Sequence, residues 1–121
     1  MGKRVLICDD SLLMRKMVAE TLMDAGWEVA GEATNGQQAI DKYREARPDA
    51  VTMDVVMPEF DGIFGLAGIR QLDPSAKVVM VSAVNQTKLI TEAIRIGAYD
   101  FIAKPFLHEH LQETMATCMG I

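Results

Sequence analysis

Apolar and polar residues follow two different patterns along the chain. Short continuous apolar runs, typical of strands buried on both faces, occupy residues 5–8, 50–53 and 78–81. Residues 27–33 form a weaker run that contains two glutamates, and residues 99–103 form a run that contains one aspartate; both are also interpreted as strands. After each run the apolar residues return every three or four positions, which is the spacing of a helix with one buried face. These helical segments span residues 11–26, 39–46, 63–72, 89–97 and 107–118. The pattern therefore predicts five strands that alternate with five helices.

This alternation indicates an α/β architecture. Strands that are apolar throughout predict a parallel sheet with helices on both faces, joined by right-handed crossovers. With 121 residues and 50% hydrophobic content, the chain suits one compact domain over residues 1–121. In such sheets ligands bind beyond the carboxyl ends of the strands, where the strand order reverses. A functional site is therefore expected at that edge.

Composition narrows the classes of function. The formal net charge is −5, which argues against non-specific binding to nucleic acid. The apolar stretches are too short for a membrane span and no secretory signal precedes Val5, so we expect a cytoplasmic protein with no membrane contact. Cys8 and Cys118 are too few for a disulfide framework or a zinc site, and their apolar surroundings predict buried thiols.

Five polar residues stand at the carboxyl ends of the predicted strands: Asp9 and Asp10 after the first, Asp54 after the third, Ser82 at the fourth and Lys104 at the fifth. Three carboxylates brought together raise one another's pKa, and a hard divalent cation such as Mg²⁺ relieves the repulsion. A cation, an ammonium and a hydroxyl around one carboxylate suit the transfer of a phosphoryl group onto it. Because carboxylate nucleophiles can form aspartyl phosphates, the edge predicts a phosphoacceptor site.

Three of these residues also have a simpler interpretation, whereas Asp54 offers the weakest one. Asp10 and Ser11 are residue types that cap helices, and Asp10 can do this and bind a metal as well. Ser82 alone is compatible with a hydroxyl satisfied at a strand end, and Lys104 alone with an ordinary surface lysine. The occurrence of all the polar groups at one edge favours the functional interpretation.

The motifs at these strand ends are similar to those of a known family. "CDD", "MDVVMPEFDG", "VSA" and "DFIAKPF" occur in this order, and the whole chain resembles the receiver domain of two-component response regulators, most closely the stand-alone chemotaxis type. The resemblance implies a flavodoxin-like, doubly wound fold with five parallel strands in the order 2-1-3-4-5 and five helices.

The resemblance also implies roles for the carboxylates. Asp54 resembles the phosphoacceptor, which receives its phosphoryl group from a phosphohistidine on a histidine kinase. Asp10, Asp54 and the backbone carbonyl of Val56 would bind Mg²⁺, and Asp9 would act mainly through water. On this basis the chain is a signalling switch rather than an enzyme, at most catalysing its own phosphorylation and slow dephosphorylation.

The remaining site residues match the family's switch machinery. Lys104 would pair with Asp54 and then with the phosphoryl oxygens, and its bond to Pro105 resembles the family's cis peptide. Ser82 would bond the phosphoryl group and draw its loop inward. Phe101 stands where many members carry tyrosine; without a hydroxyl, burial favours an inward ring, and a fixed core phenylalanine is the alternative.

The same resemblance suggests the partners. A monomer that binds a target protein, such as a flagellar motor switch protein, is the favoured function. A receiver of another pathway is one alternative. Another is a Mg²⁺-dependent phosphohydrolase of the haloacid dehalogenase type, although "CDDSL" and "MDVVM" lack the second aspartate of that family's DxDx[TV] motif and the chain has no room for a cap domain.

Two pairs of residues depart from the family pattern. Val56 and Val84 stand where chemotaxis members often carry polar side chains, which predicts a long-lived aspartyl phosphate and reliance on a separate phosphatase. Gly65 and Gly68 lie inside the predicted third helix, where each costs about 1 kcal/mol relative to alanine. They indicate either close packing against a neighbour or a locally soft helix.

Overall fold

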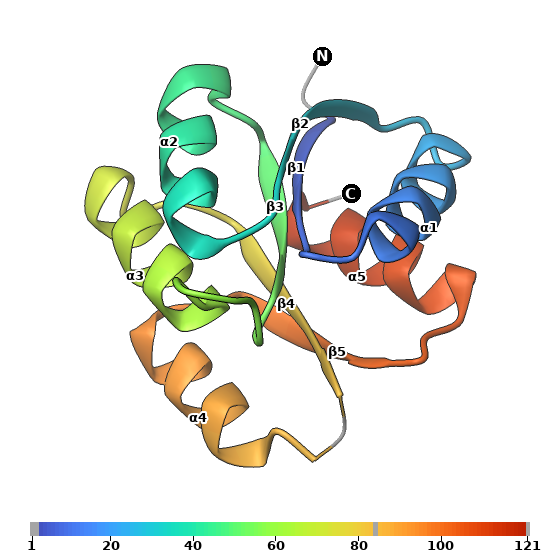
Figure 1. Ribbon diagram of the computed structural model, residues 1–121. Coiled ribbons are helices and arrows are strands. Elements are labelled where there is room, and N and C mark those ends of the chain that lie inside the picture. The colour runs from blue at the N-terminus through green and yellow to red at the C-terminus, as the bar shows by residue number, and fades with distance from the viewer. Residues whose placement is uncertain (1–2, 84, 121) are drawn as a thin grey trace.

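A five-stranded parallel sheet lies between two layers of helices in the computed structural model, which describes residues 3–83 and 85–120 (Figure 1). The strand order is β2-β1-β3-β4-β5. Figure 1 shows α2, α3 and α4 on one face of the sheet and α1 and α5 on the other. The predicted fold class, strand order and five helices are confirmed.

The elements follow one another in strict alternation. The strands are β1 (Arg4–Cys8), β2 (Glu28–Ala33), β3 (Ala50–Asp54), β4 (Val78–Ala83) and β5 (Asp100–Lys104). The helices are α1 (Leu12–Met23), α2 (Gly36–Ala46), α3 (Gly62–Leu72), α4 (Thr87–Ile96) and α5 (His108–Cys118).

The sheet separates two hydrophobic cores because successive strand residues point to opposite faces. Leu6 and Met53 pack in the core under α2, α3 and α4, whereas Val5 and Ile102 pack in the core under α1 and α5. Strands buried on both faces explain the continuous apolar runs in the sequence. Cys8 and Cys118 are buried free thiols, as predicted.

The first helix ends earlier than its apolar spacing predicts. The helix α1 stops at Met23 rather than at Gly26, which has a positive φ of 90° in the turn that follows. The backbone N–H of Trp27 donates to the carbonyl of Leu22 at 3.0 Å. Trp27 therefore belongs to the helix end, and β2 begins one residue later at Glu28.

Four apolar positions on the predicted helical spacing are exposed instead. They are Met17, Leu72, Ile94 and Leu107, which show 39%, 38%, 46% and 73% of their surface. In α1 and α4 the buried stripe is centred on other residues, including Val18 and Ile90. Leu107 is the N-cap of α5, so it precedes the first buried turn of that helix.

The glycines of α3 permit close packing. A Cβ atom on Gly65 would lie 2.9 Å from Met53 Cε, and one on Gly68 would lie 2.6 Å from Ile40 Cγ1. Both distances are below ordinary van der Waals contact. The structure thus supports close packing of α3 against α2 and β3 as the reason for glycine at these positions. Across the described part of the chain, no helix has the length and apolar character needed to cross a membrane.

Candidate functional site

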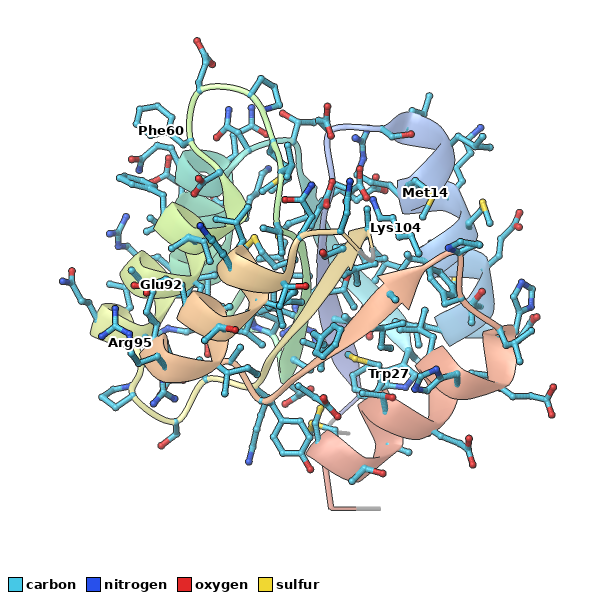
Figure 2. The ribbon with its side chains drawn as sticks, turned by 90° about the horizontal axis from the view of Figure 1, so that it is seen from below. Met14, Trp27, Phe60, Glu92, Arg95 and Lys104 are labelled. Carbon is cyan, nitrogen blue, oxygen red and sulfur yellow. The ribbon has the colours of Figure 1, made fainter. Side chains whose placement is uncertain are left out.

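The sheet register brings the predicted site residues to one edge. Cys8 pairs with Met53 across β1 and β3, so Asp9 and Asp54 follow side by side. Ser82 pairs with Ala103 across β4 and β5, which places Ser82 and Lys104 at the same edge. In Figure 2 Lys104 lies between Met14 of α1 and Glu92 of α4. Asp9, Asp10 and Asp54 each present a carboxylate oxygen within 4.8 Å of the others, as predicted.

Asp9 is a buried, fully engaged carboxylate. One oxygen accepts the Ser11 backbone N–H at 2.9 Å and the other accepts the Lys104 ammonium at 3.0 Å. Ser11 itself caps α1, because its hydroxyl accepts the Met14 N–H at 3.2 Å. The helix cap is therefore Ser11, and the exposed Asp10 keeps its carboxylate at the acidic cluster.

Asp54 is the most perturbed acid of the site. It is 7% exposed, and burial together with the nearby Asp9 raises its pKa to about 6. The Lys104 ammonium, 3.4 Å away, and the backbone N–H of Val56 act in the opposite direction without cancelling the rise. The carboxylate is thus held in a place where its charge is costly and where additional positive charge would stabilise it.

Lys104 bridges two carboxylates rather than pairing with Asp54 alone. Its Nζ atom is closer to Asp9 than to Asp54, at 3.0 Å against 3.4 Å. The predicted Lys104–Asp54 pair is present, and the shorter contact with Asp9 is an addition that the sequence did not predict. The physical reason is that a single ammonium between two buried like charges is attracted by both. The Lys104–Pro105 peptide is cis, as the motif predicts.

The two predicted switch residues are not engaged with the acidic cluster. The hydroxyl of Ser82, which is buried, donates to the neighbouring Ala83 carbonyl at 2.8 Å. Phe101 is 42% exposed, so the inward orientation predicted for its ring is wrong for this structure, and so is the fixed core phenylalanine. Phe101 belongs to the edge strand β5 and lines a cavity of about 260 Å³ that also involves Ile90 and Thr91 of α4.

Two supporting residues escaped the sequence analysis. Arg15 donates from Nη1 to the Asp9 backbone carbonyl at 2.7 Å and from Nε to Glu32 at 2.7 Å, which fixes the β1–α1 turn. Gly62 packs against the backbone of Asp54, because a Cβ atom there would lie 2.9 Å from the Asp54 carbonyl carbon. The glycine of "FDG" was the available signal for Gly62. A single arginine in a first helical turn offers no comparable signal.

The donor set fits a divalent oxygen-binding cation. Three carboxylates and one ammonium leave two negative charges at the cluster, and carboxylate oxygens are the ligands that Mg²⁺ prefers. Val56 is 54% exposed beside this cluster. Val84, the other position linked above to phosphate lifetime, lies outside the described residues.

An acidic cluster with a bridging lysine, at the carboxyl edge of a 2-1-3-4-5 sheet, defines the class of the protein as a flavodoxin-like receiver. Residues 5–116 match the model of the response regulator receiver domain. The chain belongs to this family.

The individual relatives agree with the family. The chain is 50% identical to the chemotaxis protein CheY of Thermotoga maritima, with 95% of this chain and 96% of that protein covered. It is 47% identical to protein CcdB of Bacillus subtilis, with 97% and 98% covered. One chain of the crystal structure of the CheX–CheY–BeF3–Mg²⁺ complex from Borrelia burgdorferi superposes with a TM-score of 0.89. It is 32% identical, with 94% of this chain and 87% of that chain covered.

Proposed function

We propose that this chain is a phosphorylation-activated switch in which Asp54 accepts a phosphoryl group from a histidine kinase. The observation that carries the proposal is the buried Asp54 carboxylate, with its raised pKa, between Lys104 and two further carboxylates. In the transfer, the phosphorus–nitrogen bond of the kinase phosphohistidine breaks and a phosphorus–oxygen bond to Asp54 forms. The imidazole leaves with the electron pair.

The surrounding residues would prepare Asp54 for this step. Asp10, Asp54 and the backbone carbonyl of Val56 would hold Mg²⁺, with Asp9 acting through water. Bound Mg²⁺ supplies positive charge near the transferring oxygens. The Lys104 ammonium already lies 3.4 Å from the Asp54 carboxylate. After the transfer it would form an ion pair with the phosphoryl oxygens. The Ser11 backbone N–H holds the Asp9 carboxylate in place, and the Arg15 side chain holds the Asp9 backbone carbonyl.

The signal would leave the site through Ser82 and Phe101. When phosphorylated Asp54 offers an acceptor oxygen, the Ser82 hydroxyl would exchange its bond to the Ala83 carbonyl for one to the phosphoryl group. The Phe101 ring would then turn into the adjoining cavity next to Ile90. Because these contacts favour only the phosphorylated state, they would shift the α4–β5–α5 face toward its binding conformation.

The proposed output is binding to a target protein in chemotaxis. The likeness to the chemotaxis protein CheY supports the role in chemotaxis. In this proposal residues 1–121 act as one receiver domain of a monomeric cytoplasmic protein, and a flagellar motor switch protein is the target. A receiver of another pathway is the second candidate, since the family match specifies no pathway. The dehalogenase-type hydrolase is not favoured, since the chain belongs to the receiver family.

Phosphotransfer is testable with a small donor. Incubation with acetyl phosphate and Mg²⁺ is expected to add one phosphoryl group per chain, measured by intact-protein mass spectrometry. Asp54→Asn should remain unlabelled. The exposed Asp41 on α2 provides a matched control, and Asp41→Asn should be labelled like the unaltered protein. Labelling of Asp54→Asn, undiminished labelling in EDTA, or continuous turnover of phosphate esters would contradict the proposal.

A further inference from the structure

The outer side of α3 presents aromatic side chains to solvent. Phe60 in the β3–α3 loop and Phe64 in α3 are 40% and 43% exposed, and their ring centroids lie 4.8 Å apart. Leu72 at the end of the helix is 38% exposed. These three residues are called the α3 ridge below. The inward side of α3 is separate, because Leu66 and Ile69 are fully buried there.

A groove runs along each side of the ridge. The groove between α2 and α3 has a volume of about 340 Å³ and includes Ile40, Ala67 and Gly68. The groove between α3 and α4 has a volume of about 440 Å³ and includes Ile63 and Leu89. Phe64 lines both grooves. The ridge and its two grooves therefore form one continuous surface with apolar and aromatic components.

The charges differ between the two grooves, because Arg44 lines the α2–α3 groove whereas the charged residues of the α3–α4 groove are acidic. Glu59, Asp61 and Glu92 line the α3–α4 groove, and among the described residues no cationic side chain lines it. Figure 2 shows Phe60 and Glu92 on the same side of the molecule, away from α1 and α5. Asp61 caps α3 and Glu92 is paired with Arg95, whereas Glu59 forms no ion pair within the described chain. The groove can thus accept positive charge from outside.

The charge pattern distinguishes among possible occupants. A second copy of this chain carries the same net charge of −5 and would bring carboxylates against carboxylates, which is unfavourable. A helix that presents apolar side chains at i and i+4 can place one in each groove beside Phe64. Lysine or arginine on the flank of such a helix would face Glu59. Exposed contiguous aromatic surface is itself typical of interaction sites.

We propose that the α3 ridge is a docking surface for a basic amphipathic helical segment of a partner protein. This surface borders the α4–β5–α5 face proposed for output, because Leu89 and Glu92 of α4 line the α3–α4 groove. It is separate from the strand edge that carries Asp54. Docking therefore does not require phosphorylation. Failure of the phosphotransfer test would leave this proposal standing, and the reverse also holds.

The chemistry of the occupant is testable by selection from random peptides. A phage library of random 16-residue peptides is selected in parallel against the unaltered protein and against the Phe60→Ser/Phe64→Ser double variant. The unaltered protein is expected to enrich peptides of net positive charge with apolar residues three or four positions apart. The best peptide, labelled with a fluorophore, should bind the double variant at least about tenfold more weakly, and its affinity should fall as salt is raised.

Two single variants separate docking from folding. Ala67→Lys fills the α2–α3 groove and repels a basic peptide while leaving the Phe60–Phe64 pair intact, so it should also weaken binding. Leu107→Ser removes a side chain that is 73% exposed at the start of α5, and it should bind like the unaltered protein. Thermal unfolding of each variant shows whether it is folded. If the double variant is unfolded, the binding measured with Ala67→Lys decides the test.

Several outcomes would overturn the proposal. Equal enrichment by the two proteins, acidic or uncharged winning peptides, or unchanged binding by Ala67→Lys would each do so. Amide chemical-shift changes confined to positions outside 40–44, 59–72 and 89–92 would place the peptide elsewhere. Sedimentation that shows self-association of the unaltered protein, lost in the double variant, would identify a second copy as the occupant instead.

Discussion

The Asp54 carboxylate lies 3.4 Å from Lys104 and close to two other carboxylates, and it is almost fully buried. Its pKa of about 6 stands above its usual value of 3.8, mainly because of burial. Between these two pH values the folded protein keeps a proton that the unfolded chain has released. The free energy of unfolding therefore falls as pH rises through this window. Above pH 6 the full loss of stability from ionising the buried Asp54 carboxylate is present.

Replacing this carboxylate by an amide should remove that cost. In EDTA at pH 8, Asp54→Asn is expected to raise the free energy of unfolding by on the order of 1 kcal/mol, after allowance for solvent screening. At pH 4 the gain should nearly vanish, because Asp54 is then protonated in the folded state. Urea denaturation at both pH values measures the difference. Asp41→Asn on the surface should show little change at either, and an equal effect of Asp54→Asn at pH 4 and pH 8 would contradict the assignment.

At the scale of elements, the α3 helix carries glycines for two different reasons. At Gly62 an added Cβ atom would meet backbone atoms of Asp54 and Val55, which no side-chain rotation relieves. At Gly68 it would meet only the side chain of Ile40. The Ile40 side chain can turn to another rotamer at a cost of about 1 kcal/mol.

The same substitution at the two glycines should therefore differ in effect. We expect Gly62→Ala to lower the free energy of unfolding by about 3 kcal/mol, as severe overpacking does. Gly68→Ala should change it by less than about 1 kcal/mol, because the gain in helix propensity offsets the movement of Ile40. Thermal and urea unfolding of both variants measure this contrast. Similar losses in both would show that α2 cannot adjust to α3.

The elements also show which features a sequence can predict. The order of strands and helices followed from apolar spacing, and the positions of Asp9, Asp54 and Lys104 followed from the ends of those strands. The preference of Lys104 for Asp9 and the outward ring of Phe101 did not. Both depend on distances between side chains from different elements, which spacing along one element does not contain. The contact of Arg15 with Asp9 belongs to the same kind.

At the scale of the whole molecule, the fold separates three surfaces. The carboxyl edge of the sheet gathers the acidic cluster, the α4–β5–α5 face borders the Phe101 cavity, and the α3 ridge lies on the side covered by α2, α3 and α4 (Figure 1). The proposed kinase, output target and helical partner would thus contact different parts of one small domain. Substitutions on one surface are expected to leave binding at the others intact.

The pairing of β1 with β3 has a further consequence for the kinetics of folding. Cys8 and Met53 are far apart in the sequence but pair across β1 and β3, so their pairing closes a long loop. The repulsion between Asp9 and Asp54 arises only when these two central strands lie side by side. If the folding nucleus contains these strands and the α2 helix packed on them, the repulsion is already felt in the transition state.

Asp54→Asn should then speed refolding roughly threefold at pH 8 in EDTA, with a smaller decrease in the unfolding rate. Stopped-flow refolding and unfolding in urea measure the two rates. A gain confined to the unfolding rate would place β1–β3 pairing after the barrier. In the expected case, the carboxylates of the proposed phosphorylation site would also slow the folding of the chain. Placing such a site at the centre of a parallel sheet would therefore lower the folding rate.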